Sequence, residues 1–198
     1  MSAYAYWVGI DTDPDAGAAD TAALDDFYAQ VHLPEALRSN EGFVTAARYR
    51  LETPDPRGAL GPTSLTMYTI SDRAGAERYV AREHDPAAPR PAYTPGPALW
   101  TTKTSRWRVI WEQVGGVPAP AAPSLVLVGR DAAPAPLGPQ GVTLLRRHEV
   151  FVPADPDGLP EYCTIHQGAG LAEGDGVDGS SIRWRLGYHL VGATVSAP

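Results

Sequence analysis

Strand-like segments of similar sequence occur twice along this chain, in the same order. The segment VTAAR at 44–48 is echoed by VTLLR at 142–146, and RWR at 106–108 occurs again at 183–185. A chain of 198 residues can form two small units or one larger core. Because a recurring order of similar segments indicates repeated structural units, the sequence predicts two related halves.

The first half is predicted to be a complete ferredoxin-like unit. Period-two alternation indicates strands, and apolar residues at helical spacing indicate helices. The expected elements are, in order, a strand at 4–10, a helix at 21–38, strands at 43–51 and 64–70, a helix at 74–83 and a strand at 106–114. This βαββαβ order is that of the ferredoxin-like unit. We expect the longer helix to bend at Pro34, which has no backbone N–H to donate.

The second half is predicted to keep its strands and to lose its helices. Strands are expected near 124–129, 142–146, 161–167 and 183–185. The intervals that hold helices in the first half are shorter here, and Pro- and Gly-rich loops at 132–141 and 168–179 take their place. A Pro/Gly/Ala segment at 115–123 is typical of a linker, so the expected domains are 1–114 and 124–198.

The missing helices predict how the two halves associate. A sheet without helices has two uncovered faces, and one of them must pack against another apolar surface. We therefore expect an α+β fold in which two four-stranded, ferredoxin-like sheets pack face to face within one chain, as a pseudo-dimeric α/β barrel. The alternative is a β-sandwich appended to an α+β domain.

The composition disfavours several classes of partner. The net charge is −7 with a pI near 5.1, and no basic run is present, so the sequence predicts no nucleic-acid partner. No signal-peptide pattern and no run of about 18 apolar residues occurs, which predicts a cytoplasmic protein with no membrane partner. The lone cysteine, Cys163, cannot form an internal disulfide and is expected to be a small buried hydrophobe.

One histidine on the first predicted helix is the candidate general acid or base. His32 follows Tyr28 by four residues and precedes Glu35 by three, so the three side chains can share one side of a helix. An imidazole is suited to proton transfer near neutral pH. The hypothesis is that Tyr28 and Glu35 orient His32. The structural alternative is that His32 braces the bend at Pro34.

The predicted strands and the second helix supply candidate substrate-binding residues. Arg48, Tyr68 and Trp107 are polar or amphipathic and are able to face the helices, where they would bind an aromatic, anionic or enolic ligand. The alternative for the aromatic residues is simple packing in the core. His84, at the end of the second predicted helix, is a candidate for the pocket mouth or else an ordinary loop residue.

The second half contains three histidines that fall near three different predicted strands. A three-histidine metal site built from His148, His166 and His189 is geometrically conceivable. The strand register decides whether these side chains share a face. None of the local ligand-spacing motifs of metal sites occurs, so the sequence predicts no metal site.

Three short runs in the first half carry a family resemblance: HLPE at 32–35, GF at 42–43 and ARYR at 47–50. Together they resemble the EthD-like branch of the dimeric α/β-barrel superfamily, with the second half as a degenerate repeat. The resemblance implies a ligand pocket between the sheet and its helices, often with a histidine or tyrosine as proton carrier. It implies one pocket per chain, because only the first half is expected to keep its helices.

The superfamily includes polyketide cyclases, isomerases, cofactor-free monooxygenases, decarboxylases and haem enzymes, so the fold alone does not name a reaction. The hypothesis is a cofactor-independent enzyme that transfers protons in a cyclisation, isomerisation or decarboxylation of an aromatic or polyketide-like molecule. One alternative is a non-catalytic small-molecule binding protein, and another is a haem- or metal-dependent oxygenase. The expected assembly is a monomeric pseudo-dimer or a homodimer.

Overall fold

The computed structural model describes residues 3–56, 61–116, 122–134, 142–153, 159–167 and 182–198. The strands are β1 (Tyr4–Asp11), β2 (Phe43–Thr53), β3 (Ser64–Ile70), β4 (Thr104–Gly116), β5 (Ser124–Arg130), β6 (Val142–Pro153), β7 (Tyr162–Gln167), β8 (Ile182–Leu190) and β9 (Val195–Ser196). The helices are α1 (Ala18–Phe27), the π-helix η1 (Tyr28–His32), α2 (Leu33–Ser39), α3 (Arg73–His84) and α4 (Ala98–Thr102).

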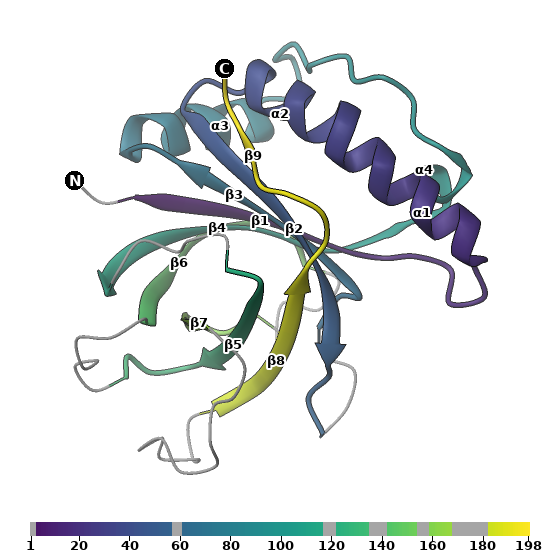
Figure 1. The fold of residues 1–198 in the computed structure, drawn as a ribbon. Coiled ribbons are helices and arrows are strands. Elements are labelled where there is room, and N and C mark those ends of the chain that lie inside the picture. Colours follow the sequence, from purple (N-terminus) through teal and green to yellow (C-terminus); the bar gives the residue numbers. More distant parts are fainter. Residues whose placement is uncertain (1–2, 57–60, 117–121, 135–141, 154–158, 168–181) are drawn as a thin grey trace.

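Eight of these strands form a closed antiparallel barrel, with helices packed on one side of it (Figure 1). The hydrogen-bonded order is β3-β1-β4-β6-β7-β5-β8-β2, and the pairing of β2 with β3 closes the ring. The short strand β9 pairs with β2 near its N-terminal end, at Thr45 and Ala46. Closure satisfies the backbone groups that the edges of an open sheet would leave unpaired.

The two predicted sheets are joined edge to edge, not stacked as separate layers. The strands of the first half follow the order β2-β3-β1-β4, and those of the second half follow the corresponding order β6-β7-β5-β8. Pairing of β4 with β6 and of β2 with β8 connects the two groups. Each edge strand of one group therefore pairs with an edge strand of the other group. The apolar faces of the two groups meet in the barrel interior. The division into two repeats remains a prediction, and most of its linker and both replacement loops lie outside the described residues.

Alternation along the strands sends side chains to two separate cores. On β1, Trp7 points into the barrel while Tyr6 points toward the helices. On β4, Trp111 points into the barrel and Ile110 toward the helices. The barrel interior is filled by large buried residues of both halves, among them Trp7, Tyr49, Trp107, Trp111, Leu127, Cys163, Ile165, Trp184, Leu186 and Tyr188. Burial of Cys163 agrees with its expected role as a small hydrophobe, and it raises the pKa of the thiol.

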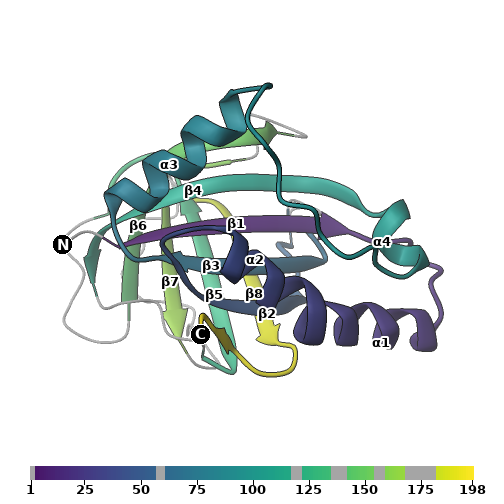
Figure 2. The same cartoon turned by 90° about the horizontal axis from the view of Figure 1, so that it is seen from above.

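The helices cover the outer face of β1 to β4 as a single layer (Figure 2). The predicted helix at 21–38 is present but starts earlier, and its irregular part precedes Pro34. In η1 the N–H of Leu33 donates to the carbonyl of Tyr28, an i to i+5 bond. Since the proline ring clashes with the carbonyl four residues before it, the wider π-turn accommodates Pro34 without ending the helical path.

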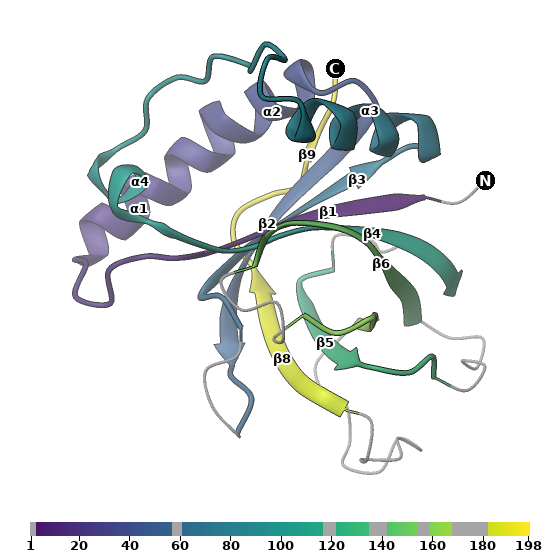
Figure 3. The same ribbon diagram turned by 180° about the vertical axis from the view of Figure 1, so that it is seen from behind.

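Most predicted elements lie where the alternation placed them, and two short ones were missed. Strands β1 to β8 overlap the eight expected strands, and α3 overlaps the expected helix at 74–83. The short helix α4 and the short strand β9 have no periodic signal of their own. The segment between α3 and α4 runs along the helical layer and brings α4 beside α1 (Figure 3). Within the described part of the chain, no helix is long and apolar enough to cross a membrane.

Candidate functional site

A pocket of about 280 Å³ lies where α1 and α4 meet the ends of the strands. Its wall combines apolar side chains with a group of hydroxyls and two arginines on neighbouring strand positions. The lining residues include Asp13, Thr21, Leu24, Arg48, Arg50, Ser64 and Leu99. Ligand pockets for drug-sized molecules are typically about 300–1,000 Å³, so this one suits a smaller molecule.

Arg48 is the polar anchor of this pocket. Its side chain is only 4% exposed, it forms an ion pair with Asp25 of α1, and its Nη2 lies 3.3 Å from the hydroxyl of Ser64. The guanidinium carbon is 4.2 Å from the centroid of the Tyr28 ring. Its Nε is buried and has no hydrogen-bond partner among the described residues. A buried guanidinium with a free donor is able to bind an additional acceptor.

The two arginines share one carboxylate. Arg48 and Arg50 alternate with the barrel-facing Tyr49, so both reach the helix side of β2, and Arg50 Nη2 lies 2.6 Å from Asp25 Oδ2. Asp13 also lines the pocket, but it is exposed on the loop after β1, where its Oδ1 accepts the N–H of Asp15. The inner wall therefore carries two guanidinium groups against one carboxylate, an arrangement that favours an anion.

His32 does not line this pocket and lies within a cage of aromatic rings. Its ring centroid is 4.5 Å from that of Trp100, 5.2 Å from Tyr28, 5.2 Å from Tyr93 and 6.2 Å from Phe27. Its Nδ1 is buried and has no partner among the described residues. Burial, reinforced by the positive charge of Lys103, lowers the pKa of His32 to about 4, so its imidazole is neutral at pH 7.

The predicted grouping of Tyr28, His32 and Glu35 is only partly present. Tyr28 contacts His32 edge to face, and burial raises the Tyr28 pKa to about 12. Glu35 instead accepts the N–H of Thr94 at 3.0 Å and its hydroxyl at 2.5 Å. These hydrogen bonds lower the pKa of Glu35. Glu35 thus anchors the segment between α3 and α4, and no hydrogen bond joins it to His32 among the described contacts.

Acidification is expected to destabilise the fold through His32. The folded pKa of about 4 lies below the unfolded value of 6.5, so the unfolded chain binds the proton first and stability falls as the pH drops from 6.5 toward 4. We expect a loss of about 2–3 kcal/mol between about pH 7 and pH 4.5. Urea unfolding at both pH values checks this. His32→Phe should remove that part of the pH dependence, and an equal dependence in both proteins would contradict the assignment.

The predicted substrate-binding residues do not form one group. Tyr68 is buried on the helix face, where its ring stacks on that of Tyr6 at 5.8 Å. Trp107 points into the barrel and stacks on Trp184 at 5.4 Å, so its expected position facing the helices is not observed. His84 is exposed at the end of α3 and pairs with Glu149 at 3.6 Å. Of the predicted residues, only Arg48 lines the pocket.

Sequence reasoning missed three polar residues of the helix face. Asp25 was not singled out from the sequence, yet it forms ion pairs with both pocket arginines. Ser64 starts β3 and meets Arg48 across the strand pair. Arg108, one position after Trp107, donates to the Tyr6 hydroxyl at 2.8 Å. The alternation of β4 contained the signal for Arg108, because a charged residue between two buried ones must reach the other face.

Comparison with known proteins identifies a fold and no sequence relative. No protein-family model and no curated protein matches the sequence. A solved structure described as a candidate chlorite dismutase matches with a TM-score of 0.52 over 97% of this chain and 96% of the other, at 12% identity. The two proteins share a fold. The likeness extends to the fold alone, so the dimeric α/β-barrel superfamily, its EthD-like branch and the tandem origin of the halves remain predictions.

The three-histidine cluster, which the sequence left conceivable but did not predict, is not found among the described residues. No group of three or more histidine, cysteine or carboxylate side chains in these segments is close enough to hold a metal ion. His166 lies 3.0 Å from the Thr164 hydroxyl, His148 packs edge-on against Tyr4, and His189 lies on β8. Strand β5 separates β7 from β8 in the barrel, which keeps His166 and His189 on non-neighbouring strands.

Proposed function

We propose that the protein binds a compact organic anion, such as an aromatic carboxylate or an enolate, in the pocket between α1, α4 and the barrel. The observation that carries this proposal is the buried Arg48 guanidinium, which lines the pocket and whose Nε has no hydrogen-bond partner among the described residues. Burying an arginine costs free energy unless its charge is used. Asp25 balances only part of this charge, because it also pairs with Arg50.

The rest of the wall supports a small, partly apolar ligand. Leu24 and Leu99 provide an apolar surface, and the hydroxyl of Ser64 lies beside the guanidinium. This combination of apolar surface and a few polar groups is typical of small-molecule sites. Arginine is well suited to a carboxylate, which it binds through two parallel hydrogen bonds.

Haem, which the superfamily resemblance brings into consideration, does not fit the described residues. Neither of the two pockets described for this chain is lined by a histidine. His32 is enclosed by four aromatic rings, and His84 is paired with Glu149. A pocket of about 280 Å³ is also smaller than those that hold drug-sized ligands.

Benzoate and its neutral isostere benzamide test the proposal directly. We expect benzoate to bind saturably and benzamide at least about tenfold more weakly, because only the carboxylate uses both hydrogen bonds and the charge of arginine. Isothermal titration calorimetry measures both. Arg50→Gln and Arg48→Lys should each weaken benzoate binding, the first by removing a charge and the second by removing the planar fork.

The matched control is Arg38→Gln. Arg38 is an exposed arginine of α2 outside the pocket, so benzoate affinity should not change. Equal affinity for benzoate and benzamide, or an equal loss in all three variants, would refute a specific anion site.

A second candidate function is proton transfer on the bound anion, as the resemblance suggests. The observation that favours it is the π-turn at Tyr28–His32, because such turns often occur at functional sites, together with the unpartnered Nδ1 of His32 among the described residues. A pKa of about 4 makes His32 a weak base at neutral pH. Deuterium exchange into a bound carbon acid that is lost in His32→Phe, with binding unchanged, would favour catalysis over simple binding.

A further inference from the structure

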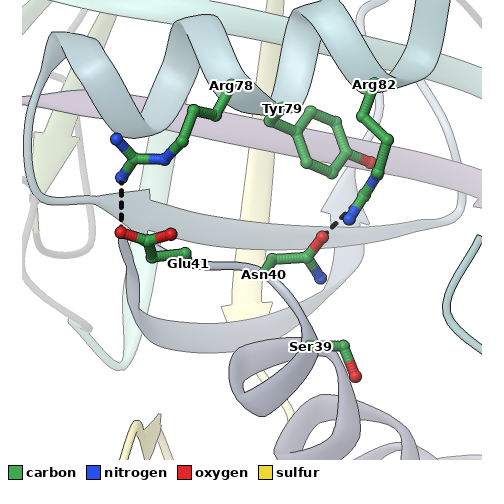
Figure 4. Close-up of a pocket in the computed structure, with 6 residues that line it drawn as sticks. All are labelled: Ser39, Asn40, Glu41, Arg78, Tyr79 and Arg82. Atoms are coloured by element: carbon green, nitrogen blue, oxygen red, sulfur yellow. Dashed lines mark hydrogen bonds and ion pairs between the residues drawn. The ribbon is translucent and has the colours of Figure 1, made fainter. Parts of the chain in front are cut away.

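A second hollow, of about 210 Å³, lies at the opposite end of the helical layer. It is formed by the turn after α2 and by one face of α3, and its lining residues are Ser39, Asn40, Glu41, Arg78, Tyr79 and Arg82 (Figure 4). None of these residues lines the pocket at Arg48. The hollow is too small for a drug-sized ligand and contains several strong hydrogen-bond donors.

A hydrogen bond and an aromatic contact hold the Arg82 side chain in place at this hollow. Its Nη2 donates to the Asn40 side-chain oxygen at 2.7 Å, and its guanidinium carbon lies 4.8 Å from the centroid of the Tyr79 ring. Asn40 is 5% exposed and donates from its amide to the Ala36 carbonyl at 2.6 Å and to the Tyr93 hydroxyl at 3.2 Å. A buried network therefore orients the guanidinium before any ligand arrives, which lowers the entropy cost of binding.

The charges around this hollow are unbalanced. The carboxylate of Glu83 forms ion pairs with three arginines, with N–O distances of 3.3 Å to Arg82, 2.9 Å to Arg90 and 2.6 Å to Arg108. Arg78 also lines the hollow, and its pairing with Glu41 is 3.3 Å long between side chains that are 48% and 81% exposed. Exposed ion pairs of this kind contribute little, so Arg78 is readily available to another anion.

One donor of Arg82 is unused. Its Nε is buried and has no hydrogen-bond partner in the segments that the structure describes. If Arg82 served only to hold Asn40 at the C-terminal end of α2, its bond to the Asn40 side-chain oxygen would be sufficient. Such a role explains neither the second arginine on the same face of α3 nor the excess of positive charge. We propose that this hollow is a second ligand site, distinct from the pocket at Arg48, and that it binds a compact oxyanion of the phosphate or small-carboxylate type.

Inorganic phosphate is the probe for this site. Titration at constant ionic strength is expected to move the ¹⁵N–¹H resonance of Arg82 Nε saturably, with a smaller shift for Arg78. Arg82→Gln and Arg78→Gln should each weaken phosphate binding by about tenfold or more, since each removes a charge-assisted hydrogen bond. The absence of a saturable shift in the folded wild-type protein would overturn the proposal.

Two control variants separate this site from general surface charge and from the first pocket. Arg73→Gln removes an arginine from the same helix, but this side chain is 72% exposed, pairs with Glu77 and lies outside the hollow, so phosphate affinity should not change. Arg50→Gln impairs the first pocket alone and should leave phosphate binding intact. An equal loss in Arg73→Gln would refute a built site, and a loss in Arg50→Gln would place phosphate in the first pocket. If Arg82→Gln fails to fold, Arg78→Gln decides the question.

Discussion

Replacing Trp111 by alanine is expected to lower the free energy of unfolding by about 3–5 kcal/mol. Trp111 has no exposed surface and lies in the barrel interior, with its ring centroid 5.1 Å from that of Trp7. The barrel wall is closed by hydrogen bonds on every side, so it cannot easily collapse into the space left by the indole. Urea unfolding monitored by circular dichroism gives the loss directly.

Two variants test whether the loss comes from packing. Trp111→Phe should cost clearly less than Trp111→Ala, because it keeps most of the ring and removes an indole N–H that has no partner among the described residues. Val114→Ala, on the same strand but 42% exposed, should change stability by less than about 0.5 kcal/mol. A cost below about 1 kcal/mol for Trp111→Ala would contradict a close-packed barrel interior.

Replacing Arg48 by methionine is expected to lower the free energy of unfolding by about 2–4 kcal/mol. The change removes one partner of a mostly buried ion pair, leaves Asp25 with Arg50 alone and removes the cation over the Tyr28 ring. The methionine side chain is of similar length and apolar, so the loss reports charge and hydrogen bonding more than volume. Urea unfolding measures it, and the surviving folded protein should bind no benzoate.

The double variant Asp25→Asn/Arg48→Met is the test of coupling. Because it removes both charges of the pair, its cost should be smaller than the sum of the two single costs. Arg50→Gln should cost about 1 kcal/mol or less, since the Arg50 side chain is 37% exposed. Additive costs for Asp25→Asn and Arg48→Met would mean that the ion pair does not stabilise the fold.

The sequence identified a residue of the candidate pocket only where the local pattern determined its position. Arg48 was identified because it is a polar residue on a predicted strand and is able to face the helices, and it lines the pocket. Trp107 was misplaced because a one-residue difference in register exchanges the two faces of a strand, and the β1–β4 pairing shifts register between Gly9 and Ile10, close to Trp107. Glu35 was assigned to His32 from helical spacing, but Thr94 approaches it from a segment with no periodic signal.

By itself, the sequence determined the eight barrel strands, the two longer helical segments of the first half and the interruption near Pro34. These features depend on local propensity, on period-two or helical alternation and on the missing N–H of proline. The tertiary structure alone decided that the two groups of strands join edge to edge in one barrel, that Asp25 lies between Arg48 and Arg50, and that four rings enclose His32. Such contacts join residues that are distant in the chain, and their geometry depends on strand register and barrel closure, which no local pattern encodes.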